Sequence, residues 1–297
     1  MSGDFAHAIA WSYDDKTIAA ALANKTIKLW DGNNGKEILT LKGHKYAVRT
    51  LAFSPDGKIL ASGSSDYTIK LWNLPTGQLR TTLSGHKSIV TSVQISPDNQ
   101  TLASQTETKN IKLWNLKTGK LITTLNPGNY PDNPLPITYS PDGKTLATVA
   151  DNSVVKIWNS HTGKLIRQLT GHQGKVRSLA FSPNAQVLAS SSDDNTIKIW
   201  DVATGKAYRT LANVGVAKFN QSAIADGVLK FSPDGKTLAT SALLASDDNT
   251  YPIASVKLWD LQTGKAIQSF PIISPFSFSS DGNAFIGVGS GGIKVWQ

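Results

Sequence analysis

Short stretches of apolar and β-branched residues recur along this chain at nearly regular intervals. The clearest of them, [IV]-K-[LIV]-W, occurs seven times. Its copies end at Trp30, Trp72, Trp114, Trp158, Trp200, Trp259 and Trp296, most of them about 42 residues apart. Self-similarity at a fixed period of roughly 20–50 residues is the signature of a repeat architecture, so the chain is best read repeat by repeat.

Each copy of this pattern lies in similar surroundings. Residues 43–83, for example, contain the stretches VRTLAFS, ILASGS, TIKLWN and QLRTTL. Between them, SPDGK and PTGQ supply the Pro, Asp-Gly and Gly residues that tight turns require. Short strands joined by such turns predict one four-stranded antiparallel sheet for each copy.

One such sheet would be apolar on both faces and could not be stable alone. Radial repetition that closes on itself buries the faces of every copy. A helical solenoid is excluded, because no stretch of about 10–12 residues has helical periodicity. The sequence therefore predicts an all-β fold, a seven-bladed β-propeller of four-stranded antiparallel blades.

Two dipeptides carry a family resemblance. Gly-His occurs at 43–44, 85–86 and 171–172, and Trp-Asp occurs at 30–31, 200–201 and 259–260, with Trp-Asn in three other copies. They resemble the opening and closing signatures of the WD-repeat (WD40) family. The resemblance covers nearly the whole chain and implies a single domain over 1–297. The LASxS and TGK turns resemble those of bacterial WD proteins, whose propellers are often fused to kinase or NTPase domains.

The resemblance also implies the blade boundaries, with the innermost strand first in each blade. The expected blades are 7–41, 48–83, 90–125, 135–169, 176–211, 227–270 and 275–297. Because Gln297 directly follows the third strand of blade 7, we expect this blade to have three strands and an exposed edge, which invites pairing with another chain.

A hydrogen-bonded set of buried side chains is a further implication of the resemblance. In blade 2 it would contain His44, Asp66, Trp72 and either Ser62 or Ser64. In blade 5 it would contain His172, Asp194, Trp200 and a serine near 190, whereas Thr108 replaces the aspartate in blade 3. His, Asp and Ser this close together could also form a catalytic triad, but a structural role is favoured because buried polar groups need partners. We predict no catalytic residue, and we expect blades 2 and 5 to show the strongest protection in hydrogen exchange.

Composition narrows the classes of function. Apolar residues make up 40% and charged residues 17% of the chain, which is typical of a soluble globular protein. No apolar run approaches the roughly 20 residues of a membrane span, and MSGDFAHAIAW is not a secretory signal. The absence of cysteine excludes disulfides, so we expect a cytoplasmic protein without membrane association.

The net charge of +9 raises the question of an anionic partner. Most lysines occupy recurring positions of the repeat and are therefore spread around the ring. Nucleic-acid binding requires a clustered basic face with stacking aromatics and is not favoured. Outside the Gly-His pairs only His7 and His161 remain, in different repeats, so no metal site and no cofactor is predicted.

Departures from the repeat mark candidate functional loops, because loops carry function more often than strands do. The loops 126–136, 212–226 and 243–254 are unusual in length or composition. In WD-repeat geometry they lie on the top face, which is formed by the loops between blades and by the turns between second and third strands. We predict that this face, around blades 4–6, contacts the partner. Alternatively, long loops are merely tolerated, because loop entropy grows slowly with length.

The candidate partner contacts belong to two groups. Those in the three unusual loops are Tyr130, Lys218, Phe219, Asp247, Asp248 and Tyr251. Those in other top loops or near the channel mouth are His7, Tyr46, Arg49, Tyr67, Lys87, Lys175 and Arg177. An acidic or phosphorylated peptide could bind the cationic members of this second group.

The leading interpretation is a non-catalytic scaffold, expected to be a monomer, that binds a protein or peptide partner. A regulatory or sensor domain of a larger signalling protein, fused to a kinase or NTPase, is the alternative. A propeller-type enzyme is the remote alternative, because it would need acid, base or metal-ligand side chains converging at the channel.

Overall fold

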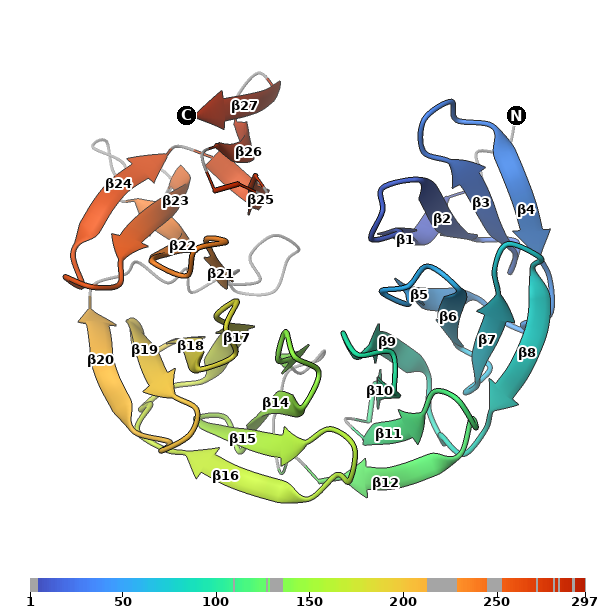
Figure 1. The fold of residues 1–297 in the computed structure, drawn as a ribbon, viewed down its shortest axis with the longest axis horizontal. Helices are drawn as coiled ribbons and strands as arrows, with labels where there is room; N and C mark the ends of the chain where they lie inside the picture. The colour runs from blue at the N-terminus through green and yellow to red at the C-terminus, as the bar shows by residue number, and fades with distance from the viewer. Residues whose placement is uncertain are drawn as a thin grey trace. The chain divides into compact units, whose positions relative to one another are not determined.

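A computed structural model of the chain describes residues 5–108, 110–126, 128, 136–212, 229–244, 253–270, 272–279, 281–282, 284–289 and 292–296. Every regular element in these residues is a β-strand (Figure 1). No helix that could cross a membrane occurs in this part of the chain. The structure therefore confirms the all-β prediction.

Consecutive strands pair into seven sheets, numbered in chain order. Sheet 1 contains β1 (Ala6–Trp11), β2 (Thr17–Leu22), β3 (Ile27–Asp31) and β4 (Glu37–Leu41). Sheet 2 contains β5 (Val48–Phe53), β6 (Ile59–Ser64), β7 (Ile69–Asn73) and β8 (Gln78–Leu83). Sheet 3 contains β9 (Val90–Ile95), β10 (Thr101–Thr106), β11 (Ile111–Asn115) and β12 (Leu121–Leu125). Sheet 4 contains β13 (Ile137–Tyr139), β14 (Thr145–Ala150), β15 (Val154–Asn159) and β16 (Leu165–Leu169).

The last three sheets follow the same order. Sheet 5 contains β17 (Val176–Phe181), β18 (Val187–Ser192), β19 (Thr196–Asp201) and β20 (Ala207–Ala212). Sheet 6 contains β21 (Leu229–Phe231), β22 (Thr237–Leu244), β23 (Ile253–Asp260) and β24 (Ala266–Phe270). Sheet 7 contains β25 (Ile272–Phe278), β26 (Phe285–Gly289) and β27 (Gly292–Trp296). Six sheets are thus four-stranded, and the described residues of sheet 7 form three strands.

Two predicted boundaries are wrong. The first strand of sheet 7 begins at Ile272, not at residue 275. The segment 243–254 is not wholly a loop, because Leu243 pairs with Ala254 and Leu244 with Ile253, so that β22 and β23 form a longer hairpin than in the other repeats. Apolar residues at both ends of this insertion continue the strands on either side of its polar centre, which explains the difference.

The chain divides into two compact units. The N-terminal unit comprises Met1–Leu135, Gly143–Leu146 and Trp158–Leu165, and the C-terminal unit comprises Pro136–Asp142, Ala147–Ile157 and Ile166–Gln297. Sheets 1–3 belong to the first unit and sheets 5–7 to the second, while the residues of sheet 4 are divided between them. The single domain over 1–297 stays a prediction.

The turn between the first and second strands is built the same way in successive sheets. In sheet 2, Ser54 Oγ donates to Asp56 Oδ1 over 2.7 Å and accepts the backbone N–H of Ile59 over 2.9 Å. Gly57 follows with a φ of 69°, a conformation that glycine adopts without strain. The pairs Ser12–Asp14, Ser96–Asp98 and Ser232–Asp234 repeat the first bond. The serine and the aspartate two residues later thus fix the hairpin through side-chain bonds to each other and to the backbone of the turn.

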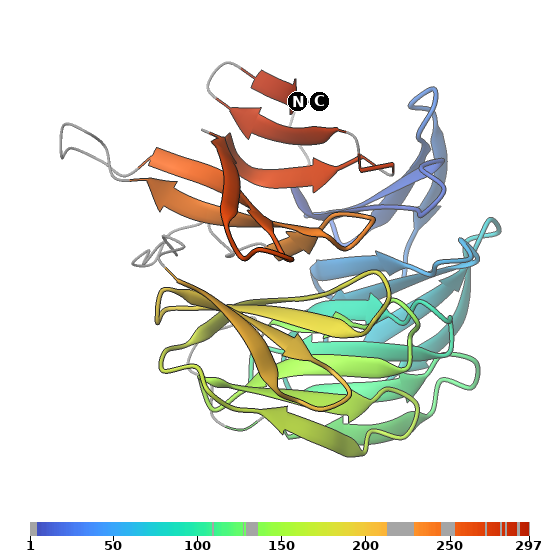
Figure 2. The same cartoon turned by 60° about the vertical axis from the view of Figure 1, so that its left-hand side comes forward.

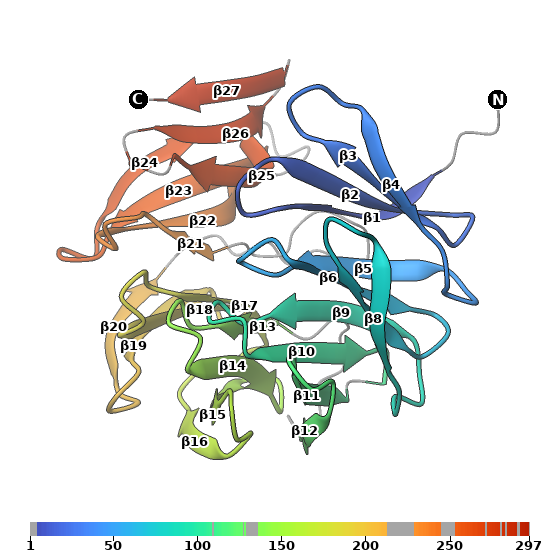
Figure 3. The ribbon, with the colours of Figure 1, turned by 45° about the vertical axis from the view of Figure 1, so that its right-hand side comes forward.

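Neighbouring sheets bury their apolar faces against each other within each unit. In the N-terminal unit, Ile27 and Leu29 of sheet 1 share a cluster with Leu60 of sheet 2, and sheet 2 packs in the same way on sheet 3 (Figure 3). In the C-terminal unit, sheet 6 packs on sheet 5 and on sheet 7 (Figure 2). Between sheets 6 and 7, the rings of Phe270 and Phe285 are stacked. These contacts bury apolar faces that a single sheet would leave exposed to water.

Gly63 is an unusually tight point in this packing. A Cβ at this position would lie 2.6 Å from Val90 Cγ1 and 2.7 Å from Thr50 Cγ2. We expect Gly63→Ala to lower the free energy of unfolding by about 1–2 kcal/mol, because overpacking forces neighbours off their rotamers. Urea unfolding measures this change, and Gly63→Val should cost more.

Val90→Ala provides the control for this prediction. If the contact with Val90 causes the strain, Gly63→Ala should cost clearly less in the Val90→Ala background. Equal costs in both backgrounds would contradict the explanation.

Candidate functional site

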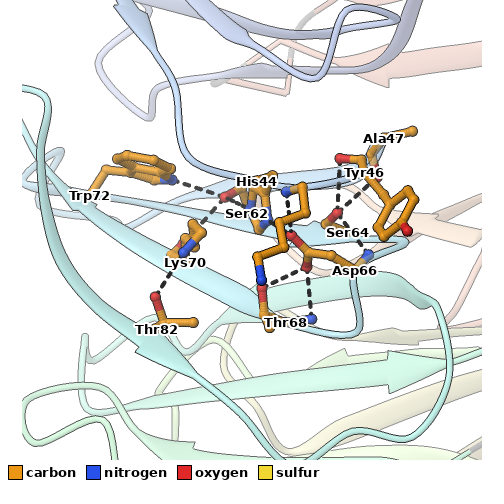
Figure 4. Close-up of polar contacts among 11 residues, drawn as sticks. His44, Tyr46, Ala47, Ser62, Ser64, Asp66, Thr68, Lys70, Trp72 and Thr82 are labelled. Carbon is orange, nitrogen blue, oxygen red and sulfur yellow. Dashed lines mark hydrogen bonds and ion pairs between the residues drawn. The ribbon is translucent and has the colours of Figure 1, made fainter.

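Four side chains of repeat 2 form one hydrogen-bonded set (Figure 4). His44 precedes β5, and its Nδ1 lies 2.8 Å from Asp66 Oδ2 in the turn between β6 and β7. Its Nε2 lies 2.8 Å from Ser62 Oγ on β6. Trp72 Nε1 on β7 donates to the same oxygen over 2.9 Å. The choice between Ser62 and Ser64 is thereby settled in favour of Ser62.

Asp66 is the acceptor that holds this turn together. It accepts the backbone N–H of Lys45 over 2.9 Å and the hydroxyl of Thr68 over 2.6 Å, besides its contact with His44. Burial alone would raise the pKa of the Asp66 carboxyl, but hydrogen bonds from Thr68, His44 and Lys45 outweigh it and lower the pKa to about 2. Burial lowers the pKa of His44, and Asp66 offsets only part of that effect. At neutral pH the set therefore contains a carboxylate and a neutral imidazole.

Repeat 5 contains an equivalent set. His172 Nδ1 lies 2.8 Å from Asp194 Oδ2, and its Nε2 lies 2.7 Å from Ser190 Oγ. Trp200 Nε1 donates to Ser190 Oγ over 2.8 Å. Hydrogen bonds from Thr196, Gln173 and His172 overcome the effect of burial and lower the pKa of Asp194 to about 2.

Repeat 3 has only part of the set. His86 Nε2 lies 2.7 Å from Ser104 Oγ, and Trp114 Nε1 donates to that oxygen over 2.8 Å. Thr108 stands where repeats 2 and 5 have aspartate, and His86 Nδ1 is buried without a hydrogen-bond partner among the described residues. Burial, with a smaller contribution from the Lys112 charge, lowers the pKa of His86 to about 4.

The complete sets do not have the geometry of a nucleophilic triad. Ser62 and Ser190 are fully buried, and each Oγ already accepts a tryptophan N–H. A nucleophilic serine must reach its substrate with a free oxygen lone pair. These sets instead satisfy buried polar groups and fix the loop before each sheet to its second and third strands.

A family model described as "WD domain, G-beta repeat" matches the chain five times, at residues 3–31, 35–73, 77–115, 137–159 and 163–201. The matched segments cover more than half of the chain. The chain belongs to the WD-repeat family. None of the curated proteins matches it. WD repeats generally serve as protein-interaction scaffolds and are typically non-catalytic.

One cluster of exposed side chains in this WD-repeat chain surrounds Tyr46. Tyr46 is 60% and Tyr67 47% exposed, so both rings are available to a partner. Lys25 Nζ lies 5.8 Å from the centroid of the Tyr46 ring, and Arg49 Nε donates to Ser65 Oγ over 2.9 Å. We call Lys25, Tyr46, Arg49 and Tyr67 the Tyr46 patch. It presents two aromatic rings and two cations on the loop side of sheets 1 and 2.

The other cationic side chains predicted to contact a partner differ in their exposure and in their pairing with neighbouring residues. Lys87 is exposed in the loop before β9. Arg177 is less available than predicted, because its Nε and Nη2 bind both carboxylate oxygens of Asp193 over 2.8 and 2.7 Å. Lys175 is half-buried and has an interaction partner. Arg49 binds the neutral Ser65, whereas Arg177 at the equivalent position is paired with the carboxylate of Asp193. The arginine of repeat 2 is therefore more available to an anionic partner than the arginine of repeat 5.

Several predicted contacts lie outside the described residues. They are Tyr130, Lys218, Phe219, Asp247, Asp248 and Tyr251. Their contribution to a partner surface stays a prediction.

The sequence did not reveal two kinds of link, one from histidine and one from arginine, at the opposite ends of the strands. His161 Nε2 lies 2.6 Å from Asp98 Oδ2, joining the last turn of repeat 4 to the first turn of repeat 3. Arg80 Nη2 donates to the carbonyl of Lys117 over 3.0 Å, and Arg209 Nη2 to that of Gln262 over 2.8 Å. The arginine bonds could have been anticipated from the sequence, because Arg recurs on the fourth strand of a repeat and contacts the last turn of the next repeat. His7 is exposed, and the described residues contain no cluster of His and acidic side chains that could hold a metal ion.

Proposed function

We propose that this WD-repeat chain is a non-catalytic scaffold that binds a protein or peptide partner through its top face. The observation that carries the proposal is the Tyr46 patch, on sheets 1 and 2; the part of the top face around blades 4–6 stays a prediction, because most residues of its loops lie outside the described ones. Exposed tyrosines next to arginine are the residue types most enriched among interface hot spots. The side chains behind the patch, His44 and Asp66, are fully hydrogen-bonded, so the loop that presents Tyr46 is fixed before a partner arrives.

The proposal includes a complete propeller. We infer that the seven sheets are its seven blades and together make one domain over 1–297. Two observations support this: each described sheet has the order that a blade requires, and sheets 1–3 and 5–7 already pack face to face within their units. Small-angle scattering tests it, because an open arrangement gives a larger radius of gyration than a closed ring.

Exchange of two tyrosines tests the binding face. We expect Tyr46→Ala/Tyr67→Ala to reduce recovery of the natural partner at least about tenfold in quantitative affinity capture from the source cells, because aromatic hot spots each contribute roughly 2 kcal/mol or more. Tyr13→Ala is the matched control, since Tyr13 is 66% exposed but lies in the turn between β1 and β2, at the other end of the strands. Equal recovery by both variants, with unchanged circular dichroism, would refute the proposed face.

A regulatory domain within a larger signalling protein is the second candidate. The LASxS sequences of the second strands and the TGK turns favour it, through their resemblance to bacterial WD proteins. The mass of the natural chain discriminates, because a fusion would be far heavier than 31.8 kDa. Both candidates use the same surface, so the tyrosine experiment applies to either.

A further inference from the structure

The third repeat has a buried donor position for which the other two Gly-His repeats supply an acceptor. His86 is 8% exposed, and its Nδ1 has no hydrogen-bond partner in the described part of the chain. In repeats 2 and 5 the equivalent nitrogen contacts an aspartate oxygen over 2.8 Å. The three repeats otherwise share the same histidine, serine and tryptophan contacts.

The hydrogen-bond network determines which ring nitrogen of His86 carries the proton. Ser104 Oγ accepts the N–H of Trp114 over 2.8 Å and lies 2.7 Å from His86 Nε2. The other acceptor for the serine hydroxyl, the carbonyl of Lys112, is 3.4 Å away. Taken along the shorter of these two contacts, the hydroxyl hydrogen goes to Nε2, which leaves the ring hydrogen of His86 on Nδ1. An N–H donor is thus buried without an acceptor, a condition that proteins rarely tolerate.

Repeat 2 shows what fills such a position. The Asp66 carboxylate accepts from His44 Nδ1, from the backbone N–H of Lys45 and from the backbone N–H of Thr68. In repeat 3 the residues at those places are His86, Lys87 and Asn110. Thr108 is occupied elsewhere, because its Oγ1 lies 3.2 Å from Thr106 Oγ1 and accepts from Asn110 Nδ2 over 3.2 Å. Repeat 3 thus has backbone N–H groups at the equivalent places, at Lys87 and Asn110, but a threonine at position 108 where repeats 2 and 5 have the carboxylate.

Charge around the position beside His86 Nδ1 favours an anion on balance. The Lys87 side chain is exposed directly after His86, and Lys112 is close enough to lower the pKa of His86. Glu107 is an opposing charge beside Thr108, and it has interactions of its own.

We propose that the loop end of repeat 3 binds a carboxylate, which accepts the Nδ1–H of His86 as Asp66 accepts that of His44. The source of the carboxylate is an acidic residue of the partner protein. This source rests on the proposed function, whereas the carboxylate site itself does not. A partner's aspartate or glutamate would complete the set, so binding and stabilisation of repeat 3 are coupled.

The site is tested on the full chain labelled with ¹⁵N-histidine, which has five histidines. Sodium formate, titrated at constant ionic strength and pH 7 against sodium chloride, should shift the His86 ring signals saturably and leave those of His44 and His172 in place. In Thr108→Asp the chain's own carboxylate fills the position beside His86 Nδ1, so the formate response should fall at least about tenfold. No response of His86, an equal response to chloride, or an equal response in Thr108→Asp overturns the proposal.

Peptides identify the source of the carboxylate. Acetyl-Gly-Asp-Gly-amide should give the His86 shift at concentrations at least about tenfold lower than acetyl-Gly-Asn-Gly-amide. A response to formate without one to the aspartyl peptide would mean a small-anion site only and would overturn the partner assignment. Partner recovery by Thr108→Asp should fall at least about tenfold, and unchanged recovery overturns the same assignment. Tyr46→Ala/Tyr67→Ala should keep the formate response, which separates a failure of this site from a failure of the proposed function.

Discussion

Asp66→Ala is expected to lower the free energy of unfolding by about 3 kcal/mol. The substitution leaves the buried His44 Nδ1–H without an acceptor and also removes the acceptor of the Lys45 and Thr68 backbone N–H groups. A buried donor that loses its partner costs roughly 1–3 kcal/mol, and loss of one member of a buried charged network costs more. Urea unfolding at pH 7 measures the difference.

The third repeat provides the control for Asp66→Ala. Thr108 occupies the equivalent turn position but makes no bond to His86, so Thr108→Ala should change stability by no more than about 0.5 kcal/mol. Asp194→Ala should reproduce the large effect in repeat 5. If Asp66→Ala is as mild as Thr108→Ala, the set does not stabilise the fold as described.

Acid should destabilise the protein in two successive pH ranges. His44, His86 and His172 have pKa values lowered by burial, so the unfolded chain binds protons that the folded chain excludes. Stability is therefore full above the ordinary histidine pKa of about 6.5 and falls as the pH decreases toward the folded value, which is about 4 for His86.

The second range belongs to Asp66 and Asp194. Their folded pKa values of about 2 lie below the ordinary aspartate value, so the stability they contribute is present above about pH 4 and is lost toward pH 2. Urea midpoints measured from pH 8 to pH 3 should decline from about pH 6.5 downward. A midpoint constant between pH 7 and pH 4.5 would contradict the burial of neutral histidines.

Thr108→Asp should weaken the first decline specifically. The new carboxylate would raise the pKa of His86 toward its ordinary value, and the unfolded and folded chains would then differ less in proton binding. Repeats 2 and 5 would contribute as before.

The repeat made most of the fold predictable. A recurring Trp, fixed turn residues and short apolar stretches indicated the position of nearly every strand, because each repeat has the same residue types at the same places in its strands and turns. The long hairpin of sheet 6 was missed because the polar residues at the centre of its insertion resemble a loop, although Leu244 and Ile253 continue the ladder. The pattern of apolar and polar residues in one strand does not show how far the neighbouring strand extends along it.

The polar sets were predictable in membership but not in detail. Ser62 and Ser64 lie on the same side of β6, since strand side chains alternate, and both are buried. Only the register, with Ser62 opposite Lys70 and Leu60 opposite Trp72, brings Ser62 to the indole. The pairing of Arg177 with Asp193 could have been noticed by comparing repeats 2 and 5, but the empty acceptor position beside His86 required coordinates.

The central claim is that the loop side of sheets 1 and 2, at Tyr46, meets the partner. Photo-crosslinking in the source cells tests it most directly, with p-benzoylphenylalanine placed at position 46 in one sample and at position 13 in another. The account predicts a discrete cross-linked protein from position 46 and none from position 13. Cross-links from position 13 with none from position 46 would contradict it.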